Sequence, residues 1–463
     1  MKSEITLNNY FIFNSTLGVN EGEEHMKILY YYPNNQDLDF QMKSVGLVEA
    51  LIQFTNTFKP SSPVNSLHTQ KKRQLYFQPE DKFWIVLTLN VPYSDITKDG
   101  STTREYIESE IQDNVYKAIL EQSYKMYKLF NSTFQISLEK LDVNGLKSKL
   151  QKFYDTYLKT IKLDQCDILN IFNGIHFLPL DTQNFLNVQC FVNEMECEYP
   201  IINHTLFMYN EHVIWSGIEP EEMQTLYQYL VNILLPTYTQ NELQGGSMPR
   251  NPSSPFSPVH YGRFVNVKST DCVGKLPKIV LTKNNESTYY NMLIYRTLSA
   301  SICLFIEDGQ EVTGQIIKSL EEFMGPKLVG IVSDIAEYYS KQNASSALMA
   351  NTSFEVSPKY IYFNKMNLAY KSTTHLDKIQ TGNLSCPKDC VKIMADICAR
   401  KSVDDYASET IVKTLNDNWI IGKRSNLREF YVALQQKDAN IKDISGEVKK
   451  LSENQLKGIF FHN

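Results

Sequence analysis

The stretches YFIF at residues 10–13 and KILYYYP at residues 27–33 determine the fold prediction for the first part of this chain. Both are short runs of aromatic and β-branched side chains, which favour buried strands, and Pro33 ends the second run. In residues 38–58, which follow, Val45, Val48 and Ile52 recur every three or four positions, as one buried face of a helix requires. The pattern therefore predicts two strands followed by a helix.

The same order of elements is predicted twice more, from residues 205–215 (TLFMYNEHVIW) and 359–370 (KYIYFNKMNLAY). Each segment predicts a strand, a turn and a second strand. Further strands are predicted at 74–77, 83–90, 278–281, 291–295, 302–307, 418–422 and 429–434. Helices are predicted at 105–130, 146–161, 219–235, 313–339, 387–400 and 444–460, with the 313–339 helix expected to break at Gly325-Pro326.

The repeated unit is thus ββαβββα, which predicts an α+β protein made of three related domains. We place these domains at residues 5–165, 180–345 and 354–463, with a Pro/Ser-rich loop at 236–258 inside the second. Any large chain with helices and strands can be divided into such units, so a chance likeness between the segments is the alternative.

Length and composition agree with this organisation. The chain has 463 residues, and at about 150 residues per domain this also suggests about three domains. Hydrophobic residues at 42% and charged residues at 21% are typical of globular proteins and exclude a disordered or coiled-coil chain. The net charge of −6 does not favour nucleic acid as a partner. The 28 Tyr and 24 Phe suit sheets and protein interfaces.

No targeting or membrane-spanning segment is evident in the sequence. The first residues lack the apolar stretch of a signal peptide, and no apolar run approaches the roughly 18 residues of a membrane span. The eight cysteines are scattered, as free thiols would be. We therefore expect a cytoplasmic protein whose membrane contact is peripheral.

The sequence offers no convincing catalytic or metal site. The motifs GxxxxGK[ST], GxGxxG, GxSxG and HExxH are absent. Residues 95–100 (DITKDG) resemble the start of a calcium loop, but the twelfth position is Tyr106, so a polar hairpin turn is favoured. Cys386, Cys390 and Cys398, with His375 upstream, depart from zinc spacings and favour packed thiols. We expect no metal, no cofactor and no catalytic residue; a hydrolase with an unrecognised site is the alternative.

The densest basic run of the chain is Lys71, Lys72 and Arg73, close to His68. Adjacent cations on a strand edge usually keep that edge solvated and prevent aggregation. The functional alternative is a contact with an acidic partner or an anionic lipid. His212, in the turn of the second predicted hairpin, is expected to be solvated.

Seven segments, in order, resemble the Ccz family of vacuolar fusion proteins. They are residues 27–34, 45–55, 66–71, 126–131, 260–264, 362–369 and 458–461. The likeness runs from about residue 8 to the C-terminus and is broken mainly at the Pro/Ser-rich loop. It implies three longin domains, each a mostly antiparallel five-stranded sheet flanked by helices.

The resemblance also implies a function. Ccz proteins pair obligately with a Mon-family longin protein to form the guanine nucleotide exchange factor of the late-endosomal Rab GTPase (the Rab-seven type). This activity drives endosome maturation and vacuole or lysosome fusion. A third regulatory subunit joins in animals, and the complex is recruited to phosphatidylinositol 3-phosphate membranes of late endosomes, lysosomes or autophagosomes. The alternative is a non-catalytic longin adaptor or tether in vesicle trafficking.

In longin-based exchange factors the first domains join edge to edge and their first helices face the Rab, which here implies residues 38–58. The Rab or Mon interface candidates are Val45, Val48, Glu49, Ile52 and Gln53. The helical period equally predicts Val45, Val48 and Ile52 as core, whereas Glu49, Gln53 and the strand after the basic run are expected at the surface. The candidates for contact with a partner or an anionic lipid are His68, Lys71, Lys72 and Arg73.

Overall fold

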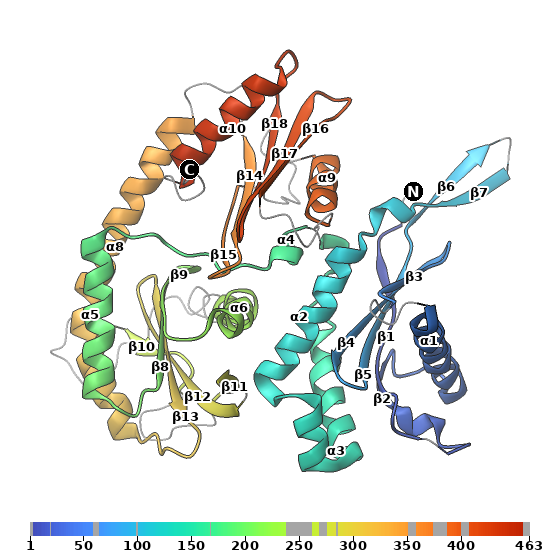
Figure 1. The fold of residues 1–463 in the computed structure, drawn as a ribbon. Coiled ribbons are helices and arrows are strands. Elements are labelled where there is room, and N and C mark those ends of the chain that lie inside the picture. Colours follow the sequence, from blue (N-terminus) through green and yellow to red (C-terminus); the bar gives the residue numbers. More distant parts are fainter. Residues whose placement is uncertain are drawn as a thin grey trace. The chain divides into compact units, whose positions relative to one another are not determined.

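The computed structural model of the chain describes residues 3–18, 20–58, 64–98, 101–166, 168–237, 262–267, 276–283, 286–350, 358–373, 387–399 and 407–456. The chain forms two compact units, Met1–Ile171 and Phe172–Asn463, which are considered separately. The first unit holds one large sheet and the second unit holds two (Figure 1).

The first sheet has five strands in the order β2-β1-β5-β4-β3, and each pair of neighbours is antiparallel. Helix α1 covers one face, and α2 and α3 cover the other (Figure 1). The strands are β1 (Thr6–Asn14), β2 (Ile28–Tyr32), β3 (Ser66–His68), β4 (Lys72–Glu80) and β5 (Phe83–Asn90). The helices are α1 (Leu38–Phe58), α2 (Asp113–Asn131) and α3 (Phe134–Tyr157), and the short turns are η1 (Glu24–Lys27), η2 (Glu108–Glu110) and η3 (Leu163–Gln165).

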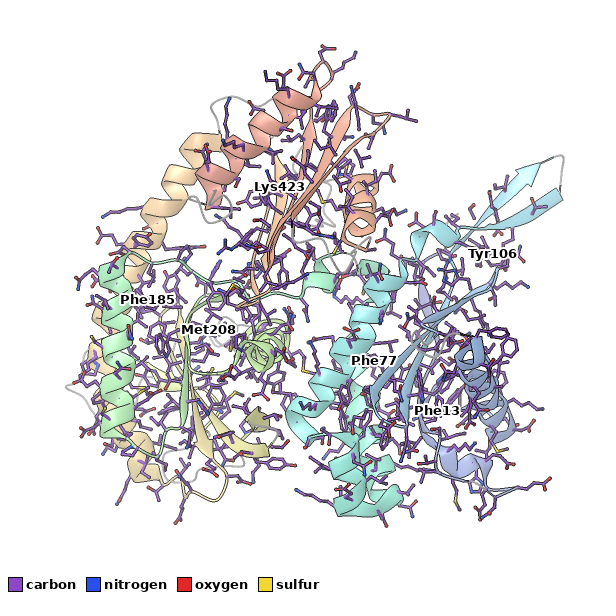
Figure 2. All side chains as sticks on the ribbon, in the orientation of Figure 1. Phe13, Phe77, Tyr106, Phe185, Met208 and Lys423 are labelled. Carbon is purple, nitrogen blue, oxygen red and sulfur yellow. The ribbon has the colours of Figure 1, made fainter. Side chains whose placement is uncertain are left out.

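Alternating side chains of these strands build two cores. Phe11 and Phe13 pack with α1 on one face, where Figure 2 labels Phe13. Tyr10 and Ile12, one position away, pack with α2 and α3 on the other face. Successive side chains of a strand point to opposite faces, so the aromatic run at residues 10–13 is buried on both sides.

A two-stranded hairpin follows the first sheet. β6 (Tyr93–Lys98) pairs with β7 (Ser101–Tyr106), and helix α2 begins only at Asp113 rather than at residue 105. The Arg104 guanidinium lies 3.9 Å from the centre of the Tyr93 ring, and its Nε lies 3.1 Å from Asp95 Oδ1. The polar hairpin predicted for this segment is therefore confirmed, whereas the predicted start of the helix is wrong.

The second sheet opens the second unit and has the order β10-β12-β13-β8-β9, with β11 also paired to β12. Its strands are β8 (His204–Tyr209), β9 (His212–Ser216), β10 (Arg263–Phe264), β11 (Lys278–Lys283), β12 (Glu286–Thr297) and β13 (Ala300–Glu307). Helices α5 and α8 lie together on one face and α6 lies on the other (Figure 1). The helices are α5 (Thr182–Glu198), α6 (Pro220–Tyr229), the π-helical turn η4 (Leu230–Leu234) and α8 (Gly314–Ala350), and the short helix α4 (Ile168–Phe172) contains the boundary between the two units.

Helix α8 differs from the prediction because it does not break at Pro326. The proline is exposed, and the neighbouring side chains of Met324 and Leu328 are completely buried against the sheet. A proline removes one backbone hydrogen bond of a helix. Burial of large side chains on both sides of Pro326 holds the helix together despite this loss.

The third sheet repeats the order of the first: β15-β14-β18-β17-β16. Helix α10 packs on one face, and α9 covers the other (Figure 1). The elements are β14 (Lys359–Asn364), β15 (Ala369–Ser372), α9 (Lys388–Ala399), β16 (Ala407–Lys413), β17 (Asn418–Ser425), β18 (Arg428–Gln435) and α10 (Ile441–Leu456). The α+β class and the three five-stranded, mostly antiparallel units are therefore confirmed, with one extra short strand in the second.

A short segment before α5 joins the second and third sheets. Ile175 forms backbone hydrogen bonds with β15 and with the residue just before it (Ile175 N to Leu368 O, 2.8 Å; Tyr370 N to Ile175 O, 2.9 Å). Val213 N of β9 donates to the carbonyl oxygen of His176, the next residue, at 2.8 Å. The same segment thus pairs with an edge strand of each sheet, which explains why both sheets belong to one compact unit.

His212 lies beside this segment and is not solvated as predicted. Its ring is half-buried near His176 and Tyr339, and this burial lowers the pKa of His212. The predicted Pro/Ser-rich loop 236–258 falls outside the described residues after position 237.

Candidate protein-interaction surface of the first domain

Helix α1 carries two different apolar stripes. Val45, Val48 and Ile52 form the first, and they are 2%, 0% and 6% exposed because they pack against the sheet. These three positions were candidates for the Rab or Mon interface, and the structure places them in the core instead. Their side chains do not contribute to the surface of the first domain.

The second stripe faces outward. Phe40, Leu47, Phe54 and Phe58 are 45%, 57%, 61% and 73% exposed. Their spacing of seven, seven and four positions keeps them on one side of a helix, and the rings of Phe54 and Phe58 lie 4.9 Å apart. We call these four residues the exposed stripe. The spacing of the exposed stripe is visible in the sequence. The buried stripe has the same helical period, however, and the interface candidates were chosen from it.

The exposed stripe is part of a concentration of exposed apolar side chains. In the described chain, fifteen large apolar side chains are exposed, and six of them belong to η1 and α1. Single exposed apolar residues are ordinary, whereas a contiguous group of them marks an interaction surface. Helix α1 is therefore the strongest candidate for a protein-binding surface among the described elements.

Two polar candidates on α1 have different positions. Glu49 is half-buried, and its carboxylate lies 2.7 Å from Lys27 Nζ of η1, so it holds that turn against the helix. Gln53 is exposed, as predicted. Of the five α1 candidates, only Gln53 lies fully on the surface.

The basic run is not a set of three solvated cations. Lys71 and Lys72 are exposed, but Arg73 is 5% exposed. Arg73 Nη1 donates to Asp113 Oδ1 at 2.7 Å, and Asp113 is the first residue of α2. Arg73 therefore differs from the two lysines, because it is buried in an ion pair that joins β4 to α2 and is not part of the exposed surface.

Asp113 also receives contacts from β3. Ser66 Oγ donates to Asp113 Oδ2 at 2.6 Å, and His68 Nε2 lies 2.7 Å from the same oxygen. Burial raises the pKa of Asp113, but the hydrogen bonds from Ser66 and His68 and the charge of Arg73 outweigh it, so the pKa lies below the usual 3.8. The carboxylate stays ionised at neutral pH and ties the edge strand to the helix.

Ser66, His68 and Asp113 are the residue types of a catalytic triad, but their geometry is different. In a triad the serine and the carboxylate contact opposite ring nitrogens of the histidine. Here Ser66 Oγ (3.1 Å) and Asp113 Oδ2 (2.7 Å) both lie nearest to Nε2 of His68. The serine hydroxyl also donates directly to the carboxylate, which is a second difference from the arrangement of a triad.

The structure describes only part of the cysteine and histidine group that was considered as a zinc site. Cys390 and Cys398 are buried and are not disulfide-bonded, while Cys386 and His375 lie outside the described residues. Within the described ranges, no group of three or more His, Cys, Asp or Glu is placed to hold a metal ion. Among the described helices, none has the length and apolar character needed to span a membrane.

The two edges of the first sheet differ in accessibility. At the β3 edge, Ser66 and Leu67 are half-exposed and His68 is exposed. At the β2 edge, residues 28–31 are all less than 9% exposed, since α1 and α3 flank the strand on its two faces. A folded domain can extend the sheet only where the edge strand is open, which favours β3 over β2.

Three family models match the three sheets. The model for the first longin domain of INTU, CCZ1 and HPS4 matches residues 7–132. Models for the second and third longin-like domains of Intu match residues 202–327 and 354–451. The fold and these matches define a protein built of three longin domains.

Curated relatives narrow the family. The chain is 41% identical to the vacuolar fusion protein CCZ1 homologs of Xenopus laevis and Nematostella vectensis, over 98% and 100% of this chain and 97% and 99% of theirs. It is 28% identical to the homolog of Dictyostelium discoideum over 99% of the chain and 98% of that protein. The chain belongs to the CCZ1 family of vacuolar fusion proteins, which confirms the resemblance found in the sequence.

Proposed function

We propose that this chain is a subunit of a guanine nucleotide exchange factor. With a Mon-family longin partner it activates the late-endosomal Rab GTPase of the Rab-seven type and so promotes endosome maturation and vacuole or lysosome fusion. The observation that carries the proposal is the exposed stripe of α1, because it offers a binding surface on the helix that faces the Rab in longin-based exchange factors.

Nucleotide exchange requires no covalent chemistry from this chain. A factor that binds the nucleotide-free GTPase more tightly weakens nucleotide binding by the same ratio. A thousandfold faster release corresponds to about 4 kcal/mol of differential binding. At roughly 25 cal/mol per Å² this needs about 160 Å² of additional apolar burial, which two large side chains can supply. The four side chains of the exposed stripe are sufficient for this purpose.

The β3 edge is the surface that we assign to the Mon-family partner. It is the more accessible edge of the first sheet, and His68, Lys71 and Lys72 lie exposed beside it. Pairing at this edge would continue the sheet into the partner's first longin domain. Lys71 and Lys72 then lie at the rim of the interface, where they contact an acidic partner surface or an anionic lipid.

Membrane recruitment is assigned to the assembled complex. The net charge of −6 gives this chain no general attraction for anionic membranes, so the contact with phosphatidylinositol 3-phosphate membranes depends on local basic positions and on the partners. We include the third regulatory subunit of the animal complex among these partners.

The test is release of a fluorescent GDP analogue from the late-endosomal Rab. The chain co-purified with a Mon-family protein is expected to accelerate release, whereas the chain alone is not. A complex that releases nucleotide no faster than buffer would contradict the proposal. Equal affinity of the complex for nucleotide-free and GDP-bound Rab would favour the adaptor or tether instead.

A further inference from the structure

The recessed edge of β2 forms the floor of a groove in the first domain. β2 has a strand neighbour, β1, on one side only, so half of its backbone N–H and C=O groups point away from the sheet. A hollow of about 310 Å³ lies along this side, between Leu38 and Gln41 of α1 and Lys147 and Gln151 of α3. A second hollow of about 310 Å³ begins at Asn34, where the first one ends.

The groove contains an uncompensated cation. Lys147 is half-buried, burial lowers its pKa, and it makes no hydrogen bond or ion pair with the rest of the described chain. The carboxylate of Asp155, which lines the second hollow, is already engaged, since Tyr30 donates its hydroxyl to it at 2.8 Å and Asn34 Nδ2 lies 3.4 Å from it. Partial burial of an ammonium group is unfavourable unless a negative charge lies near it.

The shape of the groove limits what can occupy it. Helices α1 and α3 flank the β2 edge, so it is less accessible to a folded domain than to an extended segment, which needs only the width of one strand. Such a segment can pair with the free backbone groups of an edge strand while its side chains enter the pockets on either side. The unpaired edge supplies main-chain hydrogen bonds, and Lys147 supplies a preference for negative charge.

We propose that the β2 edge binds an extended acidic segment of a partner protein, which adds a strand to the first sheet and places a carboxylate beside Lys147. The surface is separate from the β3 edge and from the exposed stripe, so the inference does not depend on the proposed exchange activity.

The probe is a short fluorescent peptide in which glutamate alternates with valine, and the matched control peptide has lysine in place of glutamate. Binding to the full-length chain is followed by fluorescence anisotropy. We expect the acidic peptide to bind at least tenfold more tightly than the basic one. Lys147→Gln should weaken this binding about tenfold, whereas Lys152→Gln, at an exposed position of the same helix, should not.

Lys147→Glu provides a second variant, which should invert the preference toward the basic peptide. Hydrogen exchange of the amides in β2 should slow when the acidic peptide binds. The inference is overturned if the acidic peptide does not bind at millimolar concentration, if both peptides bind equally, if Lys147→Gln binds like the unchanged chain, or if protection appears at β3 instead of β2.

Discussion

At the scale of single residues, Val48 and Phe54 show that apolar residues with the same helical spacing can be buried on one side of α1 and exposed on the other. Val48 is completely buried, whereas Phe54 is 61% exposed. A charge at position 48 must be buried without a partner, and a charge at position 54 remains in water. We expect Val48→Asp to lower the free energy of unfolding by about 3 kcal/mol or more and Phe54→Asp to change it by less than about 0.5 kcal/mol.

Thermal unfolding of the two variants measures this difference. A Phe54→Asp variant as unstable as Val48→Asp would mean that the exposed stripe is part of the core, and the proposed binding surface would then be lost.

The basic run likewise contains one buried residue, Arg73, and two exposed residues, Lys71 and Lys72. Arg73→Glu replaces a buried cation and leaves the Asp113 carboxylate next to a like charge, so we expect a loss of about 2 kcal/mol or more in unfolding free energy. Lys71→Glu combined with Lys72→Glu changes two exposed side chains and should leave stability within about 0.5 kcal/mol. Urea unfolding measures both, and equal effects would contradict the assignment of Arg73 to the fold.

The Asp113 network also predicts a pH dependence. The folded-state pKa of Asp113 lies below its unfolded value near 3.8, so the unfolded chain binds the proton more readily. The network therefore contributes stability above about pH 4 and loses this contribution as the pH falls through the folded-state pKa. Asp113→Asn should reduce stability at pH 7 and make the loss between pH 5 and pH 3, roughly the range of carboxylate titration, less steep.

Melting temperatures measured across this range compare the variant with the unchanged chain. A decline of the same steepness in both would show that Asp113 does not link β3 to α2 electrostatically.

At the scale of elements, the sequence predicts those that have one buried face. The helix predicted at residues 38–58 has the bounds of α1, and the paired strands that open each domain are where the aromatic runs indicate. The polar hairpin β6–β7 was predicted from its turn residues, but the length of its strands was not, because they have no alternation of apolar residues; the next helix was therefore expected to begin at residue 105, inside β7. β16 was missed because its sequence ASETIVK is mostly polar.

The candidate site was predictable at the level of the helix but not of its residues. Leu47 and Val48 are both large and apolar and lie next to each other in the sequence. Only the position of the sheet decides which one is buried. Arg73 was assigned to the surface because its partner, Asp113, lies 40 residues away in the sequence on an element whose start was predicted wrongly.

Helix α8 offers a prediction at this scale. Pro326 is exposed, and its replacement removes no packing while restoring a backbone donor to the helix. We expect Pro326→Ala to raise the free energy of unfolding by about 1 kcal/mol or more. Calorimetry of the full chain tests this expectation, and a lower melting temperature would show that the helix depends on the proline.

At the scale of the whole molecule, three copies of one fold are organised as two compact units. The first unit holds the exposed stripe, the open β3 edge and the recessed β2 edge. The second unit joins two sheets through the segment around Ile175. This division separates the domain with the candidate binding surfaces from two domains held together by shared backbone hydrogen bonds.

The most direct measurement is the rate of GDP release from the late-endosomal Rab with a complex that carries Phe54→Asp. We expect normal assembly with the Mon-family partner and at least tenfold slower release than with the unchanged complex. Leu298→Asp, at an exposed position of the second domain, is the matched control and should release nucleotide at the normal rate. A normal rate with Phe54→Asp would contradict the assignment of the exposed stripe to nucleotide exchange.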